Sequence, residues 1–228
     1  MTRLTREERR DLHSQEYVER FEASHSRRRL TRVLPLIELP DEAVVLDVAC
    51  GNGLMLEELG DRIAEYHGVD FSPDFIKAAR QRAERIAARH ATFHCEPVQD
   101  FCRHRPSEFG VALALDVSEH IYDDEWLDIL RSIRASLKPN GSLYIHTPNR
   151  DFFVERLKAR NLVLKQFPEH VAVRTASSMV ALLARAGFSR TEVHFLPHYN
   201  VLRVFHALSF LPVIGRSFKA RLFLRCQP

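Results

Sequence analysis

The sequence predicts an α/β fold, in which helices cover both faces of a mainly parallel β-sheet. Short runs of β-branched and apolar residues alternate with helical patterns from about residue 44 to the end of the chain, and this alternation favours parallel strands joined by helices. The first run, 44–48, ends in the glycine loop Gly51-Asn52-Gly53, and the second ends at Asp70. A strand, a glycine loop and a helix start form a nucleotide site, because small residues let the backbone approach the ligand and helix N–H groups face it.

Hydrophobic periodicity indicates where the individual elements lie. We expect strands near residues 44–48, 64–69, 91–95, 109–115, 141–146, 189–195 and 221–226. We expect helices near residues 54–59, 73–89, 122–137 and 175–186. Pro73 and Gly187 support two of these boundaries, because proline is favoured in the first turn of a helix and glycine just after its end.

The length and composition favour a single folded domain with a short N-terminal extension. The chain has 228 residues, of which 45% are hydrophobic, and this is enough for one buried core. We expect an N-terminal helical lid at residues 1–40, in which residues 17–39 form one or two helices. The main domain then covers residues 41–228, with an insertion near residues 149–174.

Charge and cysteine usage limit the kinds of partner and compartment. The formal net charge is +3, and Lys and Arg are interleaved with Asp and Glu through most of the chain, so we expect no nucleic-acid partner. The four cysteines show no C-x-x-C pair and no metal spacing, and the N-terminus lacks the apolar core of a secretion signal. These features favour the reducing cytoplasm.

The longest apolar stretch, residues 201–214, allows two interpretations. Arg203, His206 and Pro212 interrupt it, so it is too short and too broken to cross a bilayer, and we expect no transmembrane segment. As a helix and turn between two strands it would bury its apolar face, and this interpretation is favoured. As a surface element it would contact lipid peripherally.

The spacing of the glycines distinguishes between two classes of nucleotide-binding fold. A dinucleotide-binding loop needs G-x-G-x-x-G, and here the third glycine position falls on Leu56. The segment Asp47-x-Ala49-x-Gly51-x-Gly53 instead resembles the E/D-x-G-x-G-x-G motif of class I S-adenosylmethionine-dependent methyltransferases, with Ala49 in place of the first glycine.

The resemblance to this family extends over about residues 30–228. Four further segments resemble its second-strand motif, its fourth strand with the following loop, its turn into strand five and its late helix end. These are residues 67–73, 109–120, 137–146 and 186–188. The resemblance implies a single Rossmann-like domain with a mainly parallel seven-stranded sheet, S-adenosylmethionine as cofactor and a small-molecule acceptor bound near residues 149–174.

Several residues match positions that bind the cofactor in this family. Asp70 would accept hydrogen bonds from both ribose hydroxyls. It would otherwise cap the next helix, although Ser72 is the better cap for a helix that begins at Pro73. Gly51 and Gly53 would leave room for the cofactor, and Asp47 has either a structural role in the loop or a direct contact.

The remaining cofactor positions come from more distant segments. Phe71 would lie against the adenine, and Val98 and Gln99 would contact its edge through the backbone. Arg29, in the sequence Arg-Arg-Leu, would pair with the methionine carboxylate, and Leu115 would lie against the cofactor. Each of these roles is what the resemblance implies.

Two histidines are the candidate catalytic residues. The segment Leu-Asp-Val-Ser-Glu-His at residues 115–120 resembles the Met-Glu-Met-Leu-Glu-His segment of the ubiquinone-pathway O-methyltransferases, and this places His120 at the carboxyl end of a strand. Imidazole is a suitable base for a phenol or hydroxyl acceptor. His170 follows Phe-Pro-Glu in the acceptor region. For both histidines the alternative is a structural or surface role.

We predict no metal ion, although Asp116, Glu119 and His120 could group around a divalent cation.

The expected activity is transfer of a methyl group from S-adenosylmethionine to a small or medium-sized acceptor at oxygen, with a phenolic or quinone-like acceptor favoured. The alternatives are N-methylation of an amino sugar or another small amine, nucleic-acid methylation, and a cofactor-binding protein without catalysis. Against nucleic-acid methylation, the chain has no Asn/Asp-Pro-Pro-Tyr motif.

Overall fold

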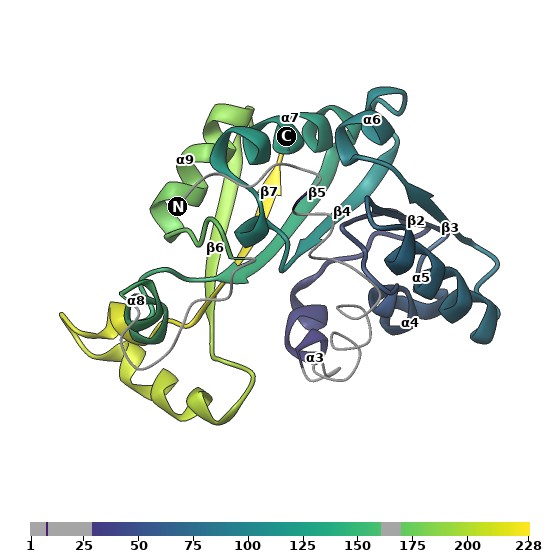
Figure 1. Ribbon diagram of the computed structural model, residues 1–228. Coiled ribbons are helices and arrows are strands. Elements are labelled where there is room, and N and C mark those ends of the chain that lie inside the picture. The colour runs from purple at the N-terminus through teal and green to yellow at the C-terminus, as the bar shows by residue number, and fades with distance from the viewer. Residues whose placement is uncertain (1–7, 9–28, 161–169) are drawn as a thin grey trace. The chain divides into compact units, whose positions relative to one another are not determined.

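A computed structural model of the chain describes Glu8, residues 29–160 and residues 170–228. In these residues seven strands form one sheet in the order β3-β2-β1-β4-β5-β7-β6 (Figure 1). The strands are β1 (Val44–Val48), β2 (Glu65–Asp70), β3 (Ala91–Cys95), β4 (Phe109–Leu115), β5 (Leu137–Pro148), β6 (Arg190–Leu196) and β7 (Arg221–Gln227). Strand β1 runs parallel to β2 and β4, and β2 runs parallel to β3. Strand β7 is antiparallel to both β5 and β6.

Helices follow most of the strands, and this confirms the α/β fold. The α-helices are α3 (Leu30–Val33), α4 (Leu54–Leu59), α5 (Pro73–Arg85), α6 (Val98–Arg103), α7 (Asp123–Ser136), α8 (Phe153–Ala159) and α9 (Ala176–Ala186). Short 3-10 helices are η1 (Leu34–Leu36), η2 (Gly60–Arg62), η3 (Ser118–His120), η4 (Val201–Phe210) and η5 (Gly215–Phe218). None of the helices in the described ranges combines the length and apolar composition that crossing a bilayer requires.

The chain divides into two compact units. The first unit contains the described residues up to 113 and residues 135–141, and the second contains residues 114–134 and 142–228. In the first unit α5 lies along β2 and β3 (Figure 1). The helix begins after Ser72, whose side chain accepts a hydrogen bond from the Phe75 N–H, and it buries Phe75, Ile76 and Ala79. This arrangement fixes the carboxyl end of β2, where Asp70 lies.

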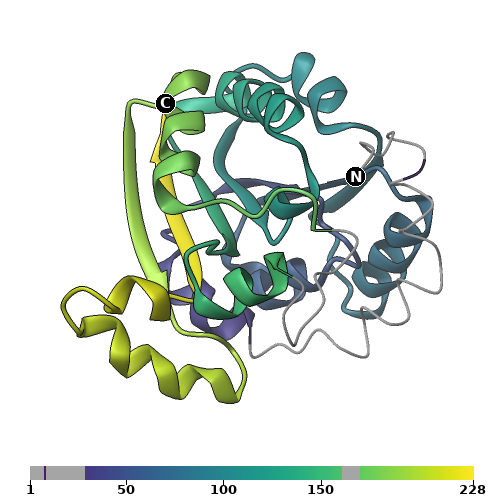
Figure 2. The same ribbon diagram turned by 60° about the vertical axis from the view of Figure 1, so that its left-hand side comes forward.

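In the second unit α9 packs against β6, as Figure 2 shows. Thr175 and Ser178 form a capping box at its start, and Gly187 ends it in a left-handed conformation with φ +95°. The fully buried Trp126 of α7 donates a hydrogen bond from Nε1 to the Met179 sulfur of α9, at 3.4 Å. These contacts hold α7 and α9 together within this unit.

Four elements differ clearly from the prediction, and most other bounds agree within one residue. Helix α5 ends at Arg85 rather than near residue 89, because Ala87 has a left-handed conformation with φ +54°. Strand β5 begins at residue 137 rather than 141. Helices α6 and α8 were not predicted, since six or seven residues give little helical periodicity. Residues 17–28 of the expected N-terminal helices lie outside the described residues, and the lid assignment stays a prediction.

The expectation that residues 201–214 bury their apolar face is wrong. Val201, Phe210 and Val213 expose 80%, 83% and 99% of their surface. The physical reason is that η4 and η5 fold back on each other, so that only one side of the pair, represented by Leu202, packs against Phe152 and its neighbours. The large apolar side chains of the opposite side are exposed.

Candidate functional site

In the first unit the loop between β1 and α4 has the backbone conformation of a nucleotide-binding turn. Ala49, Gly51 and Gly53 have φ values of +55°, +54° and +72°. A Cβ atom on Gly53 would lie 3.2 Å from the Ala79 Cβ, so glycine is required there by both conformation and space. Ala49 adopts the same left-handed conformation with a side chain, at a cost of roughly 1 kcal/mol.

Asp70 connects this loop to the end of β2. One carboxylate oxygen accepts a hydrogen bond from the Gly51 N–H at 3.1 Å, and the other accepts one from the Ser72 N–H at 2.9 Å. The side chain is buried, and Ser72 rather than Asp70 caps α5. Each carboxylate oxygen has two lone pairs and can accept more than one hydrogen bond, as from a ribose hydroxyl.

Asp47 is buried beneath the loop and hydrogen-bonded to β2. Its carboxylate accepts a hydrogen bond from the Tyr66 hydroxyl, which is fully buried. Burial raises the pKa of Asp47 to about 7, the Tyr66 bond opposes that rise, and the nearby charge of Asp70 adds to it. Burial also raises the pKa of the Cys50 thiol, so that thiol stays protonated at neutral pH. Sequence reasoning did not identify Tyr66, which is one tyrosine within an otherwise ordinary strand.

We expect the substitution Asp47→Asn to stabilise the protein increasingly as the pH rises from 4 to 7. Burial raises the pKa of Asp47 from its ordinary 3.8 to about 7 in the folded protein. Between these two pH values the folded state binds a proton that the unfolded state releases. The contribution of Asp47 to the free energy of unfolding therefore falls as the pH rises, and it is constant above pH 7. Asparagine does not titrate. The free energy of unfolding of the variant, relative to that of wild type, should therefore rise by about a few kcal/mol between pH 4 and pH 7, the order expected for such a pKa shift.

Urea unfolding at several pH values measures this difference. Asp61→Asn is the control for loss of one carboxyl group, because Asp61 is exposed. A difference between Asp47→Asn and wild type that is independent of pH would contradict the assignment.

The other predicted cofactor residues of the first unit follow the same set of parallel strands. Phe71 directly follows β2 and is half-buried, and Asp70 pairs with Cys95 at the ends of β2 and β3. Val98 is buried and Gln99 half-buried in the first turn of α6. Arg29, which is half-buried, directly precedes α3. Leu115 ends β4 within the second unit. The contacts of these residues with the cofactor stay predictions.

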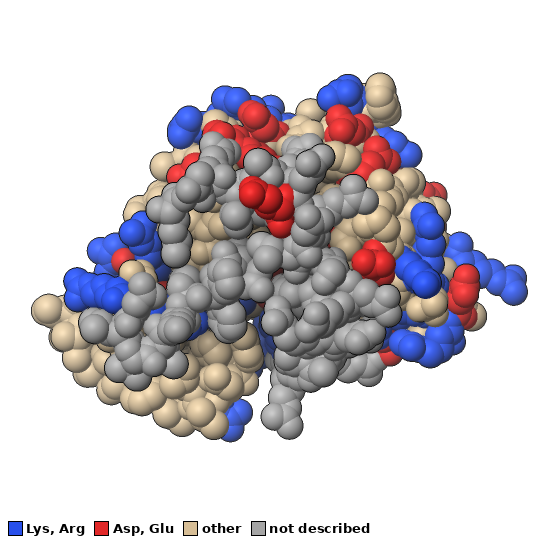
Figure 3. All heavy atoms as spheres, viewed as in Figure 1, with Lys and Arg blue, Asp and Glu red and all other residues tan. Residues whose placement is uncertain are grey.

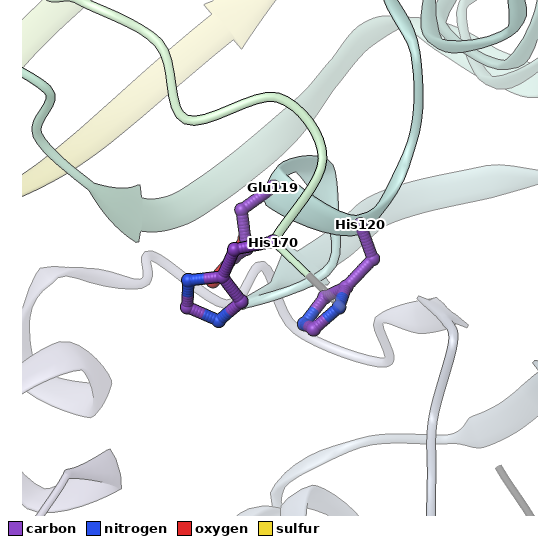
Figure 4. Close-up of side chains that lie close together, drawn as sticks. All are labelled: Glu119, His120 and His170. Atoms are coloured by element: carbon purple, nitrogen blue, oxygen red, sulfur yellow. The ribbon is translucent and has the colours of Figure 1, made fainter. Parts of the chain in front are cut away.

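In the second unit three side chains converge beside the end of β4. Glu119, His120 and His170 each offer a ligand atom, and these atoms lie within 4.8 Å of one another (Figure 4). The rings of His120 and His170 meet edge to face with centroids 5.0 Å apart. The structure therefore brings together the two predicted catalytic histidines, which are fifty positions apart in the sequence.

Arg174 holds the segment that carries His170 against η3. Its guanidinium donates hydrogen bonds to the Ser118 carbonyl at 2.5 Å and to the Ile121 carbonyl at 2.7 Å. The Ala172 N–H donates a third bond to the Glu119 carbonyl, at 3.0 Å. The Arg174 side chain is almost completely buried and also pairs with Asp123. Sequence reasoning missed Arg174, since no motif contains it.

Burial determines the protonation of the cluster. Desolvation raises the pKa of Glu119 to about 7, with a further rise from Asp116 and an opposing effect from Arg221. Desolvation lowers the pKa of His170 to about 3, and the neighbouring His120 and Lys158 lower it further. Glu119 also accepts a hydrogen bond from the Thr147 hydroxyl at 3.1 Å. At neutral pH His170 is therefore a neutral imidazole.

Asp116 belongs to a different group from the one considered in the sequence. Its carboxylate is bound by Arg221 of β7 and lies 3.1 Å from His146 Nδ1. Arg221 also donates from Nε to His146 Nε2 at 3.4 Å. The alternative metal set of Asp116, Glu119 and His120 is thus corrected, because His170 takes the place of Asp116 in the three-residue group that the described residues form. His146 and Arg221 were also missed, since both lie inside apolar strands.

The cluster has two chemical capabilities. A neutral imidazole beside a buried carboxyl group can accept a proton from a hydroxyl or amine acceptor. Two imidazoles and one carboxylate can also hold a divalent cation such as zinc or iron. Both capabilities require the fold of the second unit, because Glu119 and His170 come from separate segments.

Comparisons with known proteins agree with this geometry. A family model described as a methyltransferase domain matches residues 17–193. The ubiquinone biosynthesis O-methyltransferase of Xanthomonas campestris pv. campestris is 32% identical over 122 residues, which cover 54% of this chain and 49% of that protein. The protein of the same name from Acinetobacter baylyi is 26% identical over 165 residues, covering 69% and 68% of the two chains. The chain thus spans about half the length of the first of these curated relatives.

A solved structure shows the same fold at low sequence identity. The S-adenosylmethionine-dependent methyltransferase from Archaeoglobus fulgidus superposes with a TM-score of 0.66 and 17% identity, covering 94% of this chain and 95% of that one. The glycine loop with Asp70 fits the cofactor of this fold, S-adenosylmethionine, because the loop takes the left-handed backbone that glycine favours and a buried carboxylate lies beside it at the end of β2. From its motifs, its fold and the family match, the chain belongs to the class I S-adenosylmethionine-dependent methyltransferases.

Proposed function

We propose that this chain transfers the methyl group of S-adenosylmethionine to an oxygen of a small or medium-sized phenolic or quinone-like acceptor. The observation that carries the proposal is the convergence of Glu119, His120 and His170 in a largely buried cluster. The names of the relatives, ubiquinone biosynthesis O-methyltransferases, support oxygen as the acceptor atom.

The residues of the first unit have binding and positioning roles in this proposal. The bound cofactor supplies a methyl group on a positively charged sulfur, which becomes neutral once the methyl leaves. The chain therefore has to orient the reactants and exclude water rather than form a covalent intermediate. Gly51 and Gly53 leave room for the cofactor, and Asp70 accepts hydrogen bonds from its ribose.

The residues of the second unit remove the proton of the acceptor. As the acceptor oxygen forms its bond to the methyl carbon and the bond from carbon to sulfur breaks, the hydroxyl proton moves to the imidazole of His120. His170 is held neutral by burial, so it does not repel the imidazolium that results. Glu119 stabilises that positive charge through its carboxylate.

Methyl transfer from a deuterium-labelled cofactor tests the proposal. The purified chain is incubated with catechol, a hydroquinone and an amino sugar in parallel, and the products are analysed by mass spectrometry and NMR. We expect a labelled methyl ether from the phenolic acceptors. A labelled N-methyl product from the amino sugar alone would instead establish the amine alternative. Cofactor binding without any transfer would favour a protein without catalysis.

We expect methyl transfer to continue at an unchanged rate after treatment with EDTA, because the proposal assigns His120 to proton transfer without a metal. The measurement compares the rate before and after chelation and dialysis. Loss of activity that added magnesium, manganese or zinc restores would contradict this prediction. It would then assign Glu119, His120 and His170 to a bound cation.

A further inference from the structure

Between β6 and β7 the chain leaves the sheet and forms a compact helical excursion. This β6–β7 excursion is residues 197–220, and its two ends are held together because Leu196 pairs with Arg221 in the sheet. Helices η4 and η5 pack on each other within it. A Cβ atom on Gly215 would lie only 2.4 Å from the Ser209 carbonyl oxygen, so the two helices approach as closely as backbone allows. The excursion is therefore a defined element rather than an open loop.

One side of the β6–β7 excursion is anchored to α8. The ring of Phe153 lies 5.5 Å from that of Phe205 and 5.6 Å from that of Phe218, measured between centroids. Leu202 packs against the buried cluster of Phe152, Val154 and Ala220. All of these residues belong to the second unit. This anchoring decides which side of the excursion faces outward.

The outward side is apolar. Every large hydrophobic side chain that is exposed in the described residues lies between positions 199 and 214. They are Tyr199, Val201, Val204, Phe205, Phe210, Leu211, Val213 and Ile214, of which Phe205 is the least exposed and also contacts α8. Exposed apolar side chains gathered on one element in this way mark an interaction surface. In Figure 3 the region of the excursion, at lower left as in Figure 1, is mostly tan with blue side chains at its border.

The tip of the excursion is strained as well as exposed. Val213 exposes 99% of its surface and has φ +68°. A β-branched residue rarely adopts this left-handed conformation, and such strain is typical of functional positions. Neither burial nor a favourable backbone conformation accounts for valine at this position, whereas contact with an apolar phase does.

The charged residues of the excursion itself all have one sign. No Asp or Glu follows Glu192 in the sequence, whereas Arg203, Arg216 and Lys219 lie within the excursion itself. Arg203 is exposed, and the Arg216 side chain remains 69% exposed while it pairs with Asp151. A second copy of the chain would bring two basic surfaces together, which is electrostatically unfavourable. The partner that matches an apolar tip with a cationic border is an anionic lipid surface.

We propose that the β6–β7 excursion binds the surface of an anionic lipid bilayer. The side chains of Phe210, Leu211, Val213 and Ile214 enter the boundary between headgroups and acyl chains, and Arg203 and Arg216 lie at the level of the phosphates. The apolar stretch of residues 201–214 is too short to span the bilayer, so it lies in the interface. This inference does not depend on methyl transfer.

Co-sedimentation of the full chain with vesicles tests the proposal without cofactor or acceptor. We expect wild type to bind vesicles of phosphatidylglycerol and phosphatidylcholine, and to bind pure phosphatidylcholine and high-salt samples much less. The double variant Phe210→Ser/Val213→Asn should lower the partition coefficient by at least about tenfold, because it removes two exposed apolar side chains. Both positions are exposed, so an unchanged thermal unfolding profile should accompany the loss.

A pair of arginine variants tests the electrostatic part. Arg203→Gln should lower binding to the anionic vesicles about fivefold. The matched control is Arg131→Gln on α7, whose side chain is 55% exposed in the same unit, and it should bind as wild type does. Equal binding to neutral and anionic vesicles, or no effect of the double variant, would overturn the proposal. A wild-type dimer that the double variant converts to a monomer would overturn it as well, and would assign the patch to self-association.

Discussion

Replacement of His120 by alanine should lower kcat for methyl transfer by about 10²- to 10⁴-fold, the range of general base catalysis. The imidazole of His120 lies beside the neutral His170 and the buried Glu119, and no other residue of this cluster is as suited to accept the acceptor proton. The affinity for S-adenosylmethionine should remain unchanged, since His120 has no role in cofactor binding in the proposed mechanism. Steady-state kinetics and isothermal calorimetry measure the two quantities.

The control for His120 is His104→Ala, which removes an exposed histidine at the end of α6. That variant should keep both kcat and cofactor affinity. A rate for His120→Ala within twofold of wild type would return His120 to a structural role. Recovery of part of the rate at high pH, where the acceptor ionises by itself, would separate loss of a base from loss of structure.

Replacement of Asp70 by alanine should weaken binding of S-adenosylmethionine by roughly 1.5 to 3 kcal/mol, the scale of hydrogen bonds to a charged group. This corresponds to a dissociation constant about tenfold to a hundredfold higher. The carboxylate has two effects on the site, because it would bind the ribose and it also accepts the Gly51 N–H that shapes the loop. Calorimetric titration with the cofactor measures the loss.

Asp74→Ala provides the matched control, since it removes an exposed acid from the first turn of α5, four positions further along. Its cofactor affinity should equal that of wild type. Circular dichroism should show that both variants are folded. An Asp70→Ala protein that binds the cofactor as tightly as wild type would remove Asp70 from the ribose site.

Most elements of the first unit could be predicted, although α6 was missed. Strands β1 and β3 have the predicted bounds, β2 differs by one residue, and Ser72 caps α5 as expected. These elements could be predicted from the sequence because periodicity, helix caps and left-handed turns depend on residues close together in the chain. The glycine loop and Asp70 belong to the same class of signal, since a strand end and the turn that follows it form one local pattern.

The cluster of Glu119, His120 and His170 in the second unit could be predicted from the sequence only in part. His120 and His170 were both candidate residues, but nothing in the sequence indicated that they lie against each other. Their contact depends on Arg174, which binds the carbonyls of Ser118 and Ile121. The same limitation explains the error about Asp116, because its partner Arg221 comes from the last strand. Such pairings join segments far apart, and a buried arginine carries no signal that distinguishes it from a surface one.

The sequence by itself determined the α/β fold, the class of cofactor and the glycine loop that we propose binds it, because strand periodicity, glycine conformation and a strand-end acid are local properties. Only the tertiary structure decided that Glu119, His120 and His170 form one cluster, and that most large apolar side chains of residues 201–214 face outward. Both outcomes depend on which surfaces the folded chain brings into contact. An apolar residue indicates that burial is favourable, but the packing of η4 and η5 against α8 decides which side of them is buried.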